Sequence, residues 1–296
     1  MMNPLRLGIL GDPLTHTLSP LLHREIMAQL NISGNYLPYP TPSNALASRL
    51  QELTTENICG LNVTIPHKTA IIPYLQALSP EAALADAVNT VVIEKTGSPE
   101  KEIYLSGHNT DISGFLRSLP ADALSRLSQS HVLILGAGGS AKAVMTGLIQ
   151  HQVAALTFAV RDKARSLRLN ATIEAVKQHY GASTQINWLA LDTLPALGDF
   201  DGLINTTPVG MWPAVEACPL SARQLATLAP HAWVYDLIYR PQETQLLKIA
   251  REQGHIALNG LDMLLYQGIL AFELWQPVTV PETIIAQVRA ALLAAQ

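Results

Sequence analysis

The sequence predicts an α/β protein made of two successive α/β halves, each with a mainly parallel sheet. Short apolar strands alternate with helical patterns through residues 5–106, and a second alternation of the same kind begins near residue 131. The chain has 296 residues, about two domains at roughly 150 residues each. Its hydrophobic fraction of 48% and charged fraction of 14% fit a globular protein with substantial cores.

The first half begins with a buried strand at 5–10. Ser19-Pro20 then predicts a helix start, with the serine as N-cap and the proline at the first helical position. Leu22, Ile26 and Leu30 give this helix an apolar stripe. Further strands are expected at 35–39, 58–65, 87–94 and 102–106, and helices at 43–54 and 67–77.

The second half has a doubly wound pattern. A short apolar strand at 131–135 is followed by a helix with Ala141, Val144 and Leu148 on one face. Strands are expected at 155–160, 186–191, 202–206, 232–238 and 255–258, with helices at 164–180 and 242–253. The last segments, 261–275 and 281–294, are helical without further strands and could pack back on the first half.

Composition narrows the function classes. A net charge of -4 gives no electrostatic footprint for nucleic acid or an anionic membrane, although small anionic ligands need only local cations. Two cysteines fit a reducing compartment, and no run approaches the ~20 apolar residues of a membrane span. With no signal-peptide pattern, we expect a cytoplasmic protein. The nine histidines lack metal-site spacing, so no metal is expected.

Residues 61–68 (Leu-Asn-Val-Thr-Ile-Pro-His-Lys) carry the strongest local indication of catalysis. Asn62 and Thr64 alternate with apolar residues, so a strand here presents hydrogen-bonding groups on one face. Pro66 ends the strand and can sit in the first turn of a helix, which would place Lys68 at the helix N-terminus. The helix dipole would lower the proton affinity of an ammonium group there. This predicts a lysine that donates and accepts a proton.

A glycine-rich turn, G-x-G-x-x-A, joins the strand at 131–135 to its helix. The first glycine can form the tight turn, the second lets a pyrophosphate approach the backbone, and the alanine permits close helix–strand packing. A glycine-rich turn without a ligand is the alternative, but a strand before and a helix after favour dinucleotide binding. The turn consists of Gly136, Ala137, Gly138, Gly139, Ser140 and Ala141.

The end of the next strand indicates which dinucleotide is bound. An NAD site usually has an acidic residue there, whereas this chain has Val160 followed by Arg161, with Arg165 one helical turn later. Two guanidinium groups can grip a 2′-phosphate bidentately, which favours NADP. The alternatives are a solvent-facing helix start and an NAD site, since Asp162 lies beside the arginines.

Three other polar stretches are ambiguous on local evidence. Asp111 follows the strand at 102–106 and precedes a short helix around Gly114, where an N-cap is its commonest role. Residues 235–239 and 263–267 each put a polar side chain into an apolar element, and a satisfied core polar group is the default interpretation.

Together these stretches resemble the shikimate dehydrogenase family across essentially the whole chain. No single stretch is decisive, but their order and spacing are very specific. They are Ser19-Pro20, 62–68 (Asn-Val-Thr-Ile-Pro-His-Lys), 87–90 (Ala-Val-Asn-Thr), 109–111 (Asn-Thr-Asp), 136–139 (Gly-Ala-Gly-Gly), 205–211 (Asn-Thr-Thr-Pro-Val-Gly-Met), 235–239 and Gln267.

The resemblance implies an NADP-dependent oxidoreductase that reversibly reduces 3-dehydroshikimate to shikimate on the route to chorismate and the aromatic amino acids. It implies a substrate domain at 1–111, an NADP-binding Rossmann domain at 112–259, and C-terminal helices at 260–296 that pack back on the substrate domain. A monomer or homodimer is expected, with a small molecule as substrate.

The resemblance also implies individual roles. The catalytic pair is Lys68 and Asp111. The implied substrate contacts are Thr17, Ser19, Asn62, Thr64, Asn89, Tyr239 and Gln267. The implied cofactor contacts are the 136–141 turn, the basic segment 160–165, Leu237 and Gly260.

Three residues depart from the family pattern and keep alternatives open. Thr17 stands where the family usually has serine, which adds a methyl group beside the implied carboxylate site. Ile112 replaces a glycine, and Val160 replaces the usual asparagine. A quinate or dual-substrate dehydrogenase using NAD is therefore the nearest rival, and a catalytically silent NADP-binding regulator is a more distant one.

Overall fold

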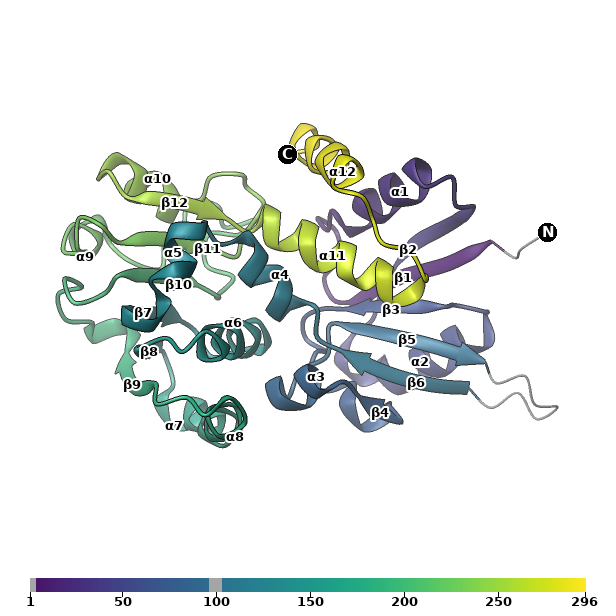
Figure 1. Cartoon of the computed structure of the whole chain (residues 1–296), viewed down its shortest axis with the longest axis horizontal. Helices are drawn as coiled ribbons and strands as arrows, with labels where there is room; N and C mark the ends of the chain where they lie inside the picture. Colours follow the sequence, from purple (N-terminus) through teal and green to yellow (C-terminus); the bar gives the residue numbers. More distant parts are fainter. Residues whose placement is uncertain (1–3, 96–102) are drawn as a thin grey trace. The chain divides into compact units, whose positions relative to one another are not determined.

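The computed structural model describes residues 4–95 and 103–296. Its packing divides into two units: unit 1 consists of Met1–Gly114 and Leu265–Ala295, and unit 2 consists of Phe115–Leu264 with Gln296. Two helices, α4 (Asp111–Ser118) and α11 (Leu261–Trp275), cross the division (Figure 1). The boundaries expected from the sequence, 111/112 and 259/260, lie near these crossings.

The sheet of unit 1 is mainly parallel, with strand order β2-β1-β3-β5-β6-β4. β5 runs antiparallel to both of its neighbours, β3 and β6, and the other neighbouring pairs are parallel. In the register of β3 and β5, Asn62 lies opposite Thr90. The strands are β1 (Leu5–Gly11), β2 (Gly34–Pro40), β3 (Gly60–Val63), β4 (Ala77–Leu78), β5 (Thr90–Lys95) and β6 (Ile103–His108).

Helices cover this sheet through apolar side chains. α2 (Leu46–Thr55) buries Leu46, Leu50 and Leu53 in a core shared with β3, β5 and β6. α1 (Ser19–Gln29) packs against β1, β2 and the C-terminal helix α12 (Glu282–Ala294). The remaining helix, α3, spans Pro80–Ala85. These contacts place the C-terminal helix α12 against the N-terminal helix α1 within unit 1.

Two local expectations for unit 1 are wrong. The N-cap of α1 is Leu18, so Ser19 is the first helical residue, and the Thr17 hydroxyl accepts the Ser19 amide at 3.3 Å. The helix expected at 67–77 is reduced to a 3₁₀ turn, η2, at Ile72–Tyr74. The Lys68 carbonyl, which a helix would pair with Ile72, instead accepts the Val88 amide at 2.7 Å.

Unit 2 has the strand order β12-β11-β10-β7-β8-β9, and every neighbouring pair is parallel. Read from β9, this is the 3-2-1-4-5-6 order of a doubly wound dinucleotide-binding fold. The order of succession reverses between β7 and β10, where ligands of such folds bind at the strands' carboxyl ends. The strands are β7 (His131–Leu135), β8 (Ala155–Val160), β9 (Gln185–Ala190), β10 (Gly202–Asn205), β11 (Trp233–Asp236) and β12 (Ile256–Asn259).

The helices of unit 2 are α5 (Ala121–Ser125), α6 (Gly139–Gln150), α7 (Lys163–Ser166), α8 (Asn170–Tyr180), α9 (Ala222–Leu225) and α10 (Gln245–Glu252). The single helix expected at 164–180 is divided by a 3₁₀ turn at Leu167–Leu169. Asn170, of a type that favours helix ends, begins α8. The two-part α/β architecture, mainly parallel in unit 1 and Rossmann-type in unit 2, is confirmed. Within the described ranges, no helix is long and apolar enough to cross a bilayer.

Candidate active site

The polar centre of unit 1 is an ion pair between Lys68 and Asp111. Lys68 Nζ lies 2.7 Å from Asp111 Oδ2, and both side chains are largely buried, at 13% and 8% exposure. Lys68 follows β3, whereas Asp111 follows β6 as the first residue of α4. The pair joins two segments 43 residues apart in sequence. Burial protects this pair from the solvent screening that weakens surface ion pairs.

The helix-dipole argument for Lys68 is not supported by the local fold. Thr64 O accepts the His67 amide at 2.8 Å, which closes a turn, and His67 O accepts the Ile71 amide at 3.0 Å. One helical turn follows, and Pro73 then lacks the N–H that would continue it. The environment of Lys68 is therefore set by the Asp111 carboxylate and not by the end of a helix.

Asn89 connects this pair to a helix from the other end of the chain. Its Nδ2 donates to Asp111 Oδ1 at 2.9 Å and to Gln267 Oε1 at 3.2 Å. Its Oδ1 accepts the backbone amide of Thr110 at 2.8 Å. Asn89 lies immediately before β5, and because β5 is antiparallel its start lies beside the ends of β3 and β6. This topology brings Lys68, Asn89 and Asp111 together.

Asn62 lies next to this group but its side chain points into the interior of unit 1. It is 5% exposed. Its Oδ1 accepts the Tyr36 hydroxyl at 2.8 Å and contacts His23 Nε2 at 3.1 Å. Its Nδ2 donates to Thr90 Oγ1 at 3.2 Å and to Asn89 O at 3.3 Å.

The remaining expected substrate contacts of unit 1 lie before α1 and after β3. The Thr17 hydroxyl donates to the buried Ser19 hydroxyl at 3.2 Å. Thr64 is half-buried, and its amide donates to Leu10 O at 2.9 Å. Its methyl group packs so closely over Gly11 that a Cβ at that glycine would meet it at 2.3 Å. Glycine is therefore required at position 11 for Thr64 to lie where it does.

In unit 2, the glycine turn lies at the carboxyl end of β7. Gly136 has φ +100°, and a Cβ there would meet Thr206 Oγ1 at 2.9 Å, so only glycine fits. Gly138 is exposed, with open space around the position of a Cβ. It precedes α6 and provides no side-chain cap for the first amides of that helix. Ala141 is fully buried against the sheet. The turn therefore has the room and the amide donors that a pyrophosphate needs.

The basic segment follows β8. Val160, the last residue of that strand, is buried, and Arg161 directly after it is exposed. Arg165 belongs to α7, but its side chain lies outside what the structure describes. An exposed guanidinium at this strand end can reach a phosphate on the adenosine ribose.

Three further predicted residues lie in the loops after β11 and β12. The Leu237 amide donates to Asn205 O at 3.0 Å. A Cβ on Gly260 would meet Leu237 O at 2.0 Å, which makes glycine obligatory there. Tyr239 is half-buried, and its carbonyl accepts Gln296 Nε2 at 2.6 Å.

A buried carboxylate orders these loops, and it was not among the predicted site residues. Asp236, the last residue of β11, accepts Asn205 Nδ2 at 3.0 Å, the Ile238 amide at 3.1 Å and the Thr244 hydroxyl at 2.7 Å. Burial raises its pKa to about 6, and these three hydrogen bonds partly offset the rise. Asn205 in turn accepts the Thr207 amide and hydroxyl. The sequence indicated a satisfied core polar group here, and the hydrogen bonds agree.

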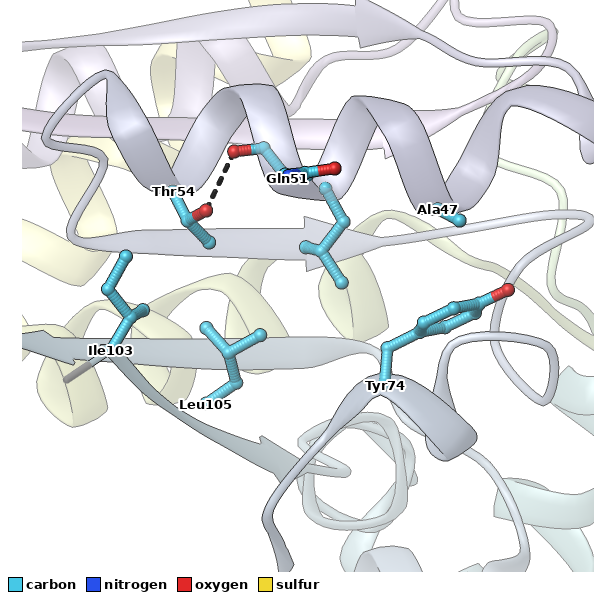
Figure 2. Close-up of a pocket in the computed structure, with 7 residues that line it drawn as sticks. Ala47, Gln51, Thr54, Tyr74, Ile103 and Leu105 are labelled. Carbon is cyan, nitrogen blue, oxygen red and sulfur yellow. Dashed lines mark hydrogen bonds between the residues drawn. The ribbon is translucent and has the colours of Figure 1, made fainter.

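A separate hollow of about 230 Å³ lies on unit 1 between α2, η2 and β6 (Figure 2). It is lined mainly by apolar groups such as Leu50, Tyr74 and Leu105. Its lining residues, within the described part of unit 1, include neither a charged side chain nor any predicted site residue. These lining residues therefore offer no charged group for proton transfer.

Comparison with known proteins finds relatives over nearly the whole chain. Residues 9–91 match the family model of a shikimate dehydrogenase substrate binding domain, and residues 260–293 match that of a shikimate 5′-dehydrogenase C-terminal domain. A shikimate dehydrogenase (NADP(+)) of Trichormus variabilis is 38% identical over 286 residues, which is 95% of this chain and 94% of the relative. This chain belongs to the shikimate dehydrogenase family.

Solved structures of similar proteins have the same fold. Shikimate 5-dehydrogenase from Thermus thermophilus, in complex with NADP(H) and shikimate, is 32% identical with a TM-score of 0.77, covering 97% of this chain and 99% of that one. Quinate dehydrogenase from Corynebacterium glutamicum, in complex with NAD, is 30% identical with a TM-score of 0.81, covering 98% and 99%.

Two threonines that hold the site together were not predicted as site residues. The Thr90 hydroxyl lies 3.1 Å from Asn89 Oδ1, and the Thr110 hydroxyl accepts Asn89 Nδ2 at 2.9 Å. Both are buried, and each directly follows or precedes a predicted site residue in a quoted motif. Their position in those motifs was the available signal.

Among the described residues, no cluster of three or more His, Cys, Asp or Glu could hold a metal ion.

The raised pKa of Asp236 predicts a pH dependence of stability. The folded protein favours the protonated carboxyl, so this contribution is fully present below pH ~4 and is lost as pH rises through about 6. The loss reaches about 3 kcal/mol, since each tenfold change in proton affinity is worth about 1.4 kcal/mol. Denaturant unfolding at pH 4, 5, 6 and 7 should therefore show Asp236→Asn gaining stability relative to wild type as pH rises. A difference that stays constant over this range would contradict the prediction.

Proposed function

We propose that this protein is an NADP-dependent shikimate dehydrogenase, which reversibly reduces 3-dehydroshikimate to shikimate. The observation that carries the proposal is the buried pair of Lys68 and Asp111, joined at 2.7 Å and held by Asn89. An ammonium group oriented by a carboxylate can donate a proton to a developing alkoxide, as a carbonyl reduction requires. Family membership and the dinucleotide-type fold of unit 2 support the same activity.

The chemistry assigns separate tasks to the two groups of the pair. NADPH, when bound, supplies the hydride that reduces the ring carbonyl. Lys68 Nζ stabilises the developing alkoxide and gives it a proton. Asp111 orients the ammonium through their 2.7 Å contact and balances its positive charge in this largely buried position. In the reverse direction Lys68 accepts the hydroxyl proton.

The proposed substrate contacts are of residue types that suit a polyhydroxy carboxylate. The hydroxyls of Thr17, Ser19 and Thr64 can bind the carboxylate and ring hydroxyls, and the amide of Gln267 offers a further donor and acceptor. Tyr239 belongs to the same proposed substrate set. A buried polar group left unpaired by a wrong substrate costs about 1 to 3 kcal/mol, so such a site selects by its hydrogen bonds.

The residues of unit 2 fit NADP. The open space at Gly138 and the uncapped amides of α6 suit the pyrophosphate. Arg161 and Arg165 would hold the 2′-phosphate, and Leu237 and Gly260 would lie along the nicotinamide half. We expect NADP over NAD because no acidic residue ends β8, where NAD sites usually have one.

Two rival functions remain distinct from this proposal. The first is a quinate or dual-substrate dehydrogenase using NAD, which Thr17 and the likeness to a quinate dehydrogenase favour. The second is a silent NADP-binding regulator, and the retained pair of Lys68 and Asp111 argues against it. We further propose a cytoplasmic enzyme that acts as a monomer or homodimer.

A spectrophotometric assay of the purified protein tests the function. We expect reduction of NADP with shikimate to be at least about tenfold more efficient, in kcat/KM, than the reaction of quinate with either cofactor, because Thr17 adds only one methyl group. A preference for quinate with NAD would replace the proposal by the first rival. Cofactor binding without turnover of either substrate would favour the silent regulator.

Lys68→Ala should lower kcat by about 10²- to 10⁴-fold, the usual contribution of a positioned proton donor. NADP binding, measured by fluorescence titration, should be unchanged because Lys68 belongs to unit 1. Lys177→Ala is the matched control, since Lys177 makes a surface ion pair with Glu174 at 3.7 Å in α8. Near-normal turnover of Lys68→Ala would refute the proton-transfer role.

Arg161→Ala should raise KM for NADP by about ten- to a hundredfold and leave KM for NAD nearly unchanged. The reason is the loss of a charge-assisted hydrogen bond to the 2′-phosphate, worth about 1.5 to 3 kcal/mol. Arg168→Ala, which removes another exposed arginine seven positions later, is the control. Equal effects of Arg161→Ala on the two cofactors would exclude a specific contact with the 2′-phosphate.

A further inference from the structure

A buried histidine in the interior of unit 1 has no role in the chemistry described so far. His23, on α1, is fully buried. Its ring stacks on Tyr36, with centroids 4.3 Å apart, and lies 5.2 Å from the ring of Trp275. Its Nε2 is 3.1 Å from Asn62 Oδ1. The histidine therefore contacts Asn62 from the side of the apolar interior.

The protein backbone fixes the orientation of the Asn62 amide. Its nitrogen lies 3.3 Å from the carbonyl oxygen of Asn89, which can only accept a hydrogen bond. The amide oxygen must then face Tyr36 and His23. Because that oxygen can only accept, His23 Nε2 must carry a hydrogen and donate it.

The other ring nitrogen of His23 keeps the imidazole neutral. Nδ1 is buried without a hydrogen-bond partner in the part of the chain that the structure describes. A proton there would be an unpaired charge in the interior. Burial accordingly lowers the pKa of His23 to about 3, against the smaller opposing effect of its hydrogen bond to Asn62.

These contacts use the whole hydrogen-bonding capacity of Asn62. Its oxygen accepts two hydrogens, from Tyr36 and His23, and its nitrogen donates two, to Asn89 O and Thr90. A primary amide has two acceptor positions and two donor hydrogens. A direct bond from Asn62 to a substrate would therefore break one of these four.

From Asn62 the hydrogen bonds continue toward the catalytic pair, and each residue donates a hydrogen to the next one. Thr90 Oγ1 accepts from Asn62, so its own hydrogen is available to Asn89 Oδ1 at 3.1 Å. The Thr110 amide, an obligatory donor, holds the same oxygen at 2.8 Å. The nitrogen of Asn89 must then point to Asp111 Oδ1, at 2.9 Å. Asp111 is left with Oδ2 facing Lys68.

We propose that His23 is a positioning residue for the catalytic pair, acting as a neutral Nε2–H donor at the inner end of the hydrogen-bond chain His23–Asn62–Thr90–Asn89–Asp111–Lys68. Asn62 serves within this chain and not as a direct substrate ligand. The inference rests on the proposed function for its kinetic test. Its structural content, the tautomer of His23, can be tested without any activity.

The kinetic test compares three variants of the full chain. His23→Phe keeps an aromatic ring on Tyr36 but removes the donor, and should lower kcat by about three- to tenfold, the effect of one neutral hydrogen bond. KM for shikimate and for NADP should stay within about twofold, since His23 reaches neither ligand in the proposed site. His23→Gln, which restores an N–H donor, should recover most of the lost kcat.

Trp275→Phe is the matched control. Trp275 packs on His23 and donates from Nε1 to Val91 O at 3.0 Å, but makes no hydrogen bond to Asn62 within the described residues. It should lower the melting temperature and leave kcat unchanged. Equal kcat losses in His23→Phe, His23→Gln and Trp275→Phe would show a purely structural role and overturn the inference. If His23→Phe does not fold, Tyr36→Phe removes the other donor to the same oxygen and should give the same kcat loss.

Nitrogen-15 NMR of histidine-labelled wild-type protein at pH 7 tests the tautomer directly. The resonance of His23, assigned by its loss in His23→Gln, should show a protonated Nε2 and an unprotonated Nδ1. Protonation at Nδ1 would overturn the inference whatever the enzyme's activity. Absence of shikimate turnover in wild type, by contrast, would defeat the proposed function and leave the tautomer prediction standing.

Discussion

The requirement that a buried amide be fully hydrogen-bonded organises the polar centre of unit 1. Asn89 is 2% exposed, and leaving its donors or acceptor unpaired would cost about 1 to 3 kcal/mol each. Its partners come from three separate parts of the sequence: the turn at Thr110 and Asp111, the neighbouring Thr90, and Gln267 of α11. The hydrogen bonds of this one asparagine therefore tie the N-terminal segment of unit 1 to its C-terminal segment at α11.

Much of the fold could be predicted from the sequence because it depends on patterns that are local in the chain. The strands of unit 2 and their order of appearance follow from apolar runs separated by helical patterns. The glycine turn at 136–141 follows from its place between β7 and α6. Gly260 is glycine for a steric reason, since a Cβ there would lie 2.0 Å from the Leu237 carbonyl oxygen.

The parts that sequence reasoning missed depend on tertiary hydrogen bonds. The expected helix after Pro66 is absent because the Lys68 carbonyl is used by Val88, far along the chain. The local interpretation of Asp111 as an N-cap likewise could not include Lys68 and Asn89 as partners of its carboxylate. The role proposed for His23 has no signal in the sequence, because nothing in its neighbourhood identifies Asn62 as its contact.

The antiparallel strand β5 has a consequence for how this family can vary in length. β5 and β6 form a hairpin in which Thr90 pairs with His108 at one end and Lys95 pairs with Ile103 at the other. Asn89 and Asp111 flank the first end, so the proton-transfer groups lie at the opposite end of the ladder from Lys95 and Ile103. A residue pair added to the ladder at the Lys95–Ile103 end lengthens both strands without changing the register at Thr90 and His108. The far ends of these two strands can therefore differ in length while the proton-transfer groups stay in place.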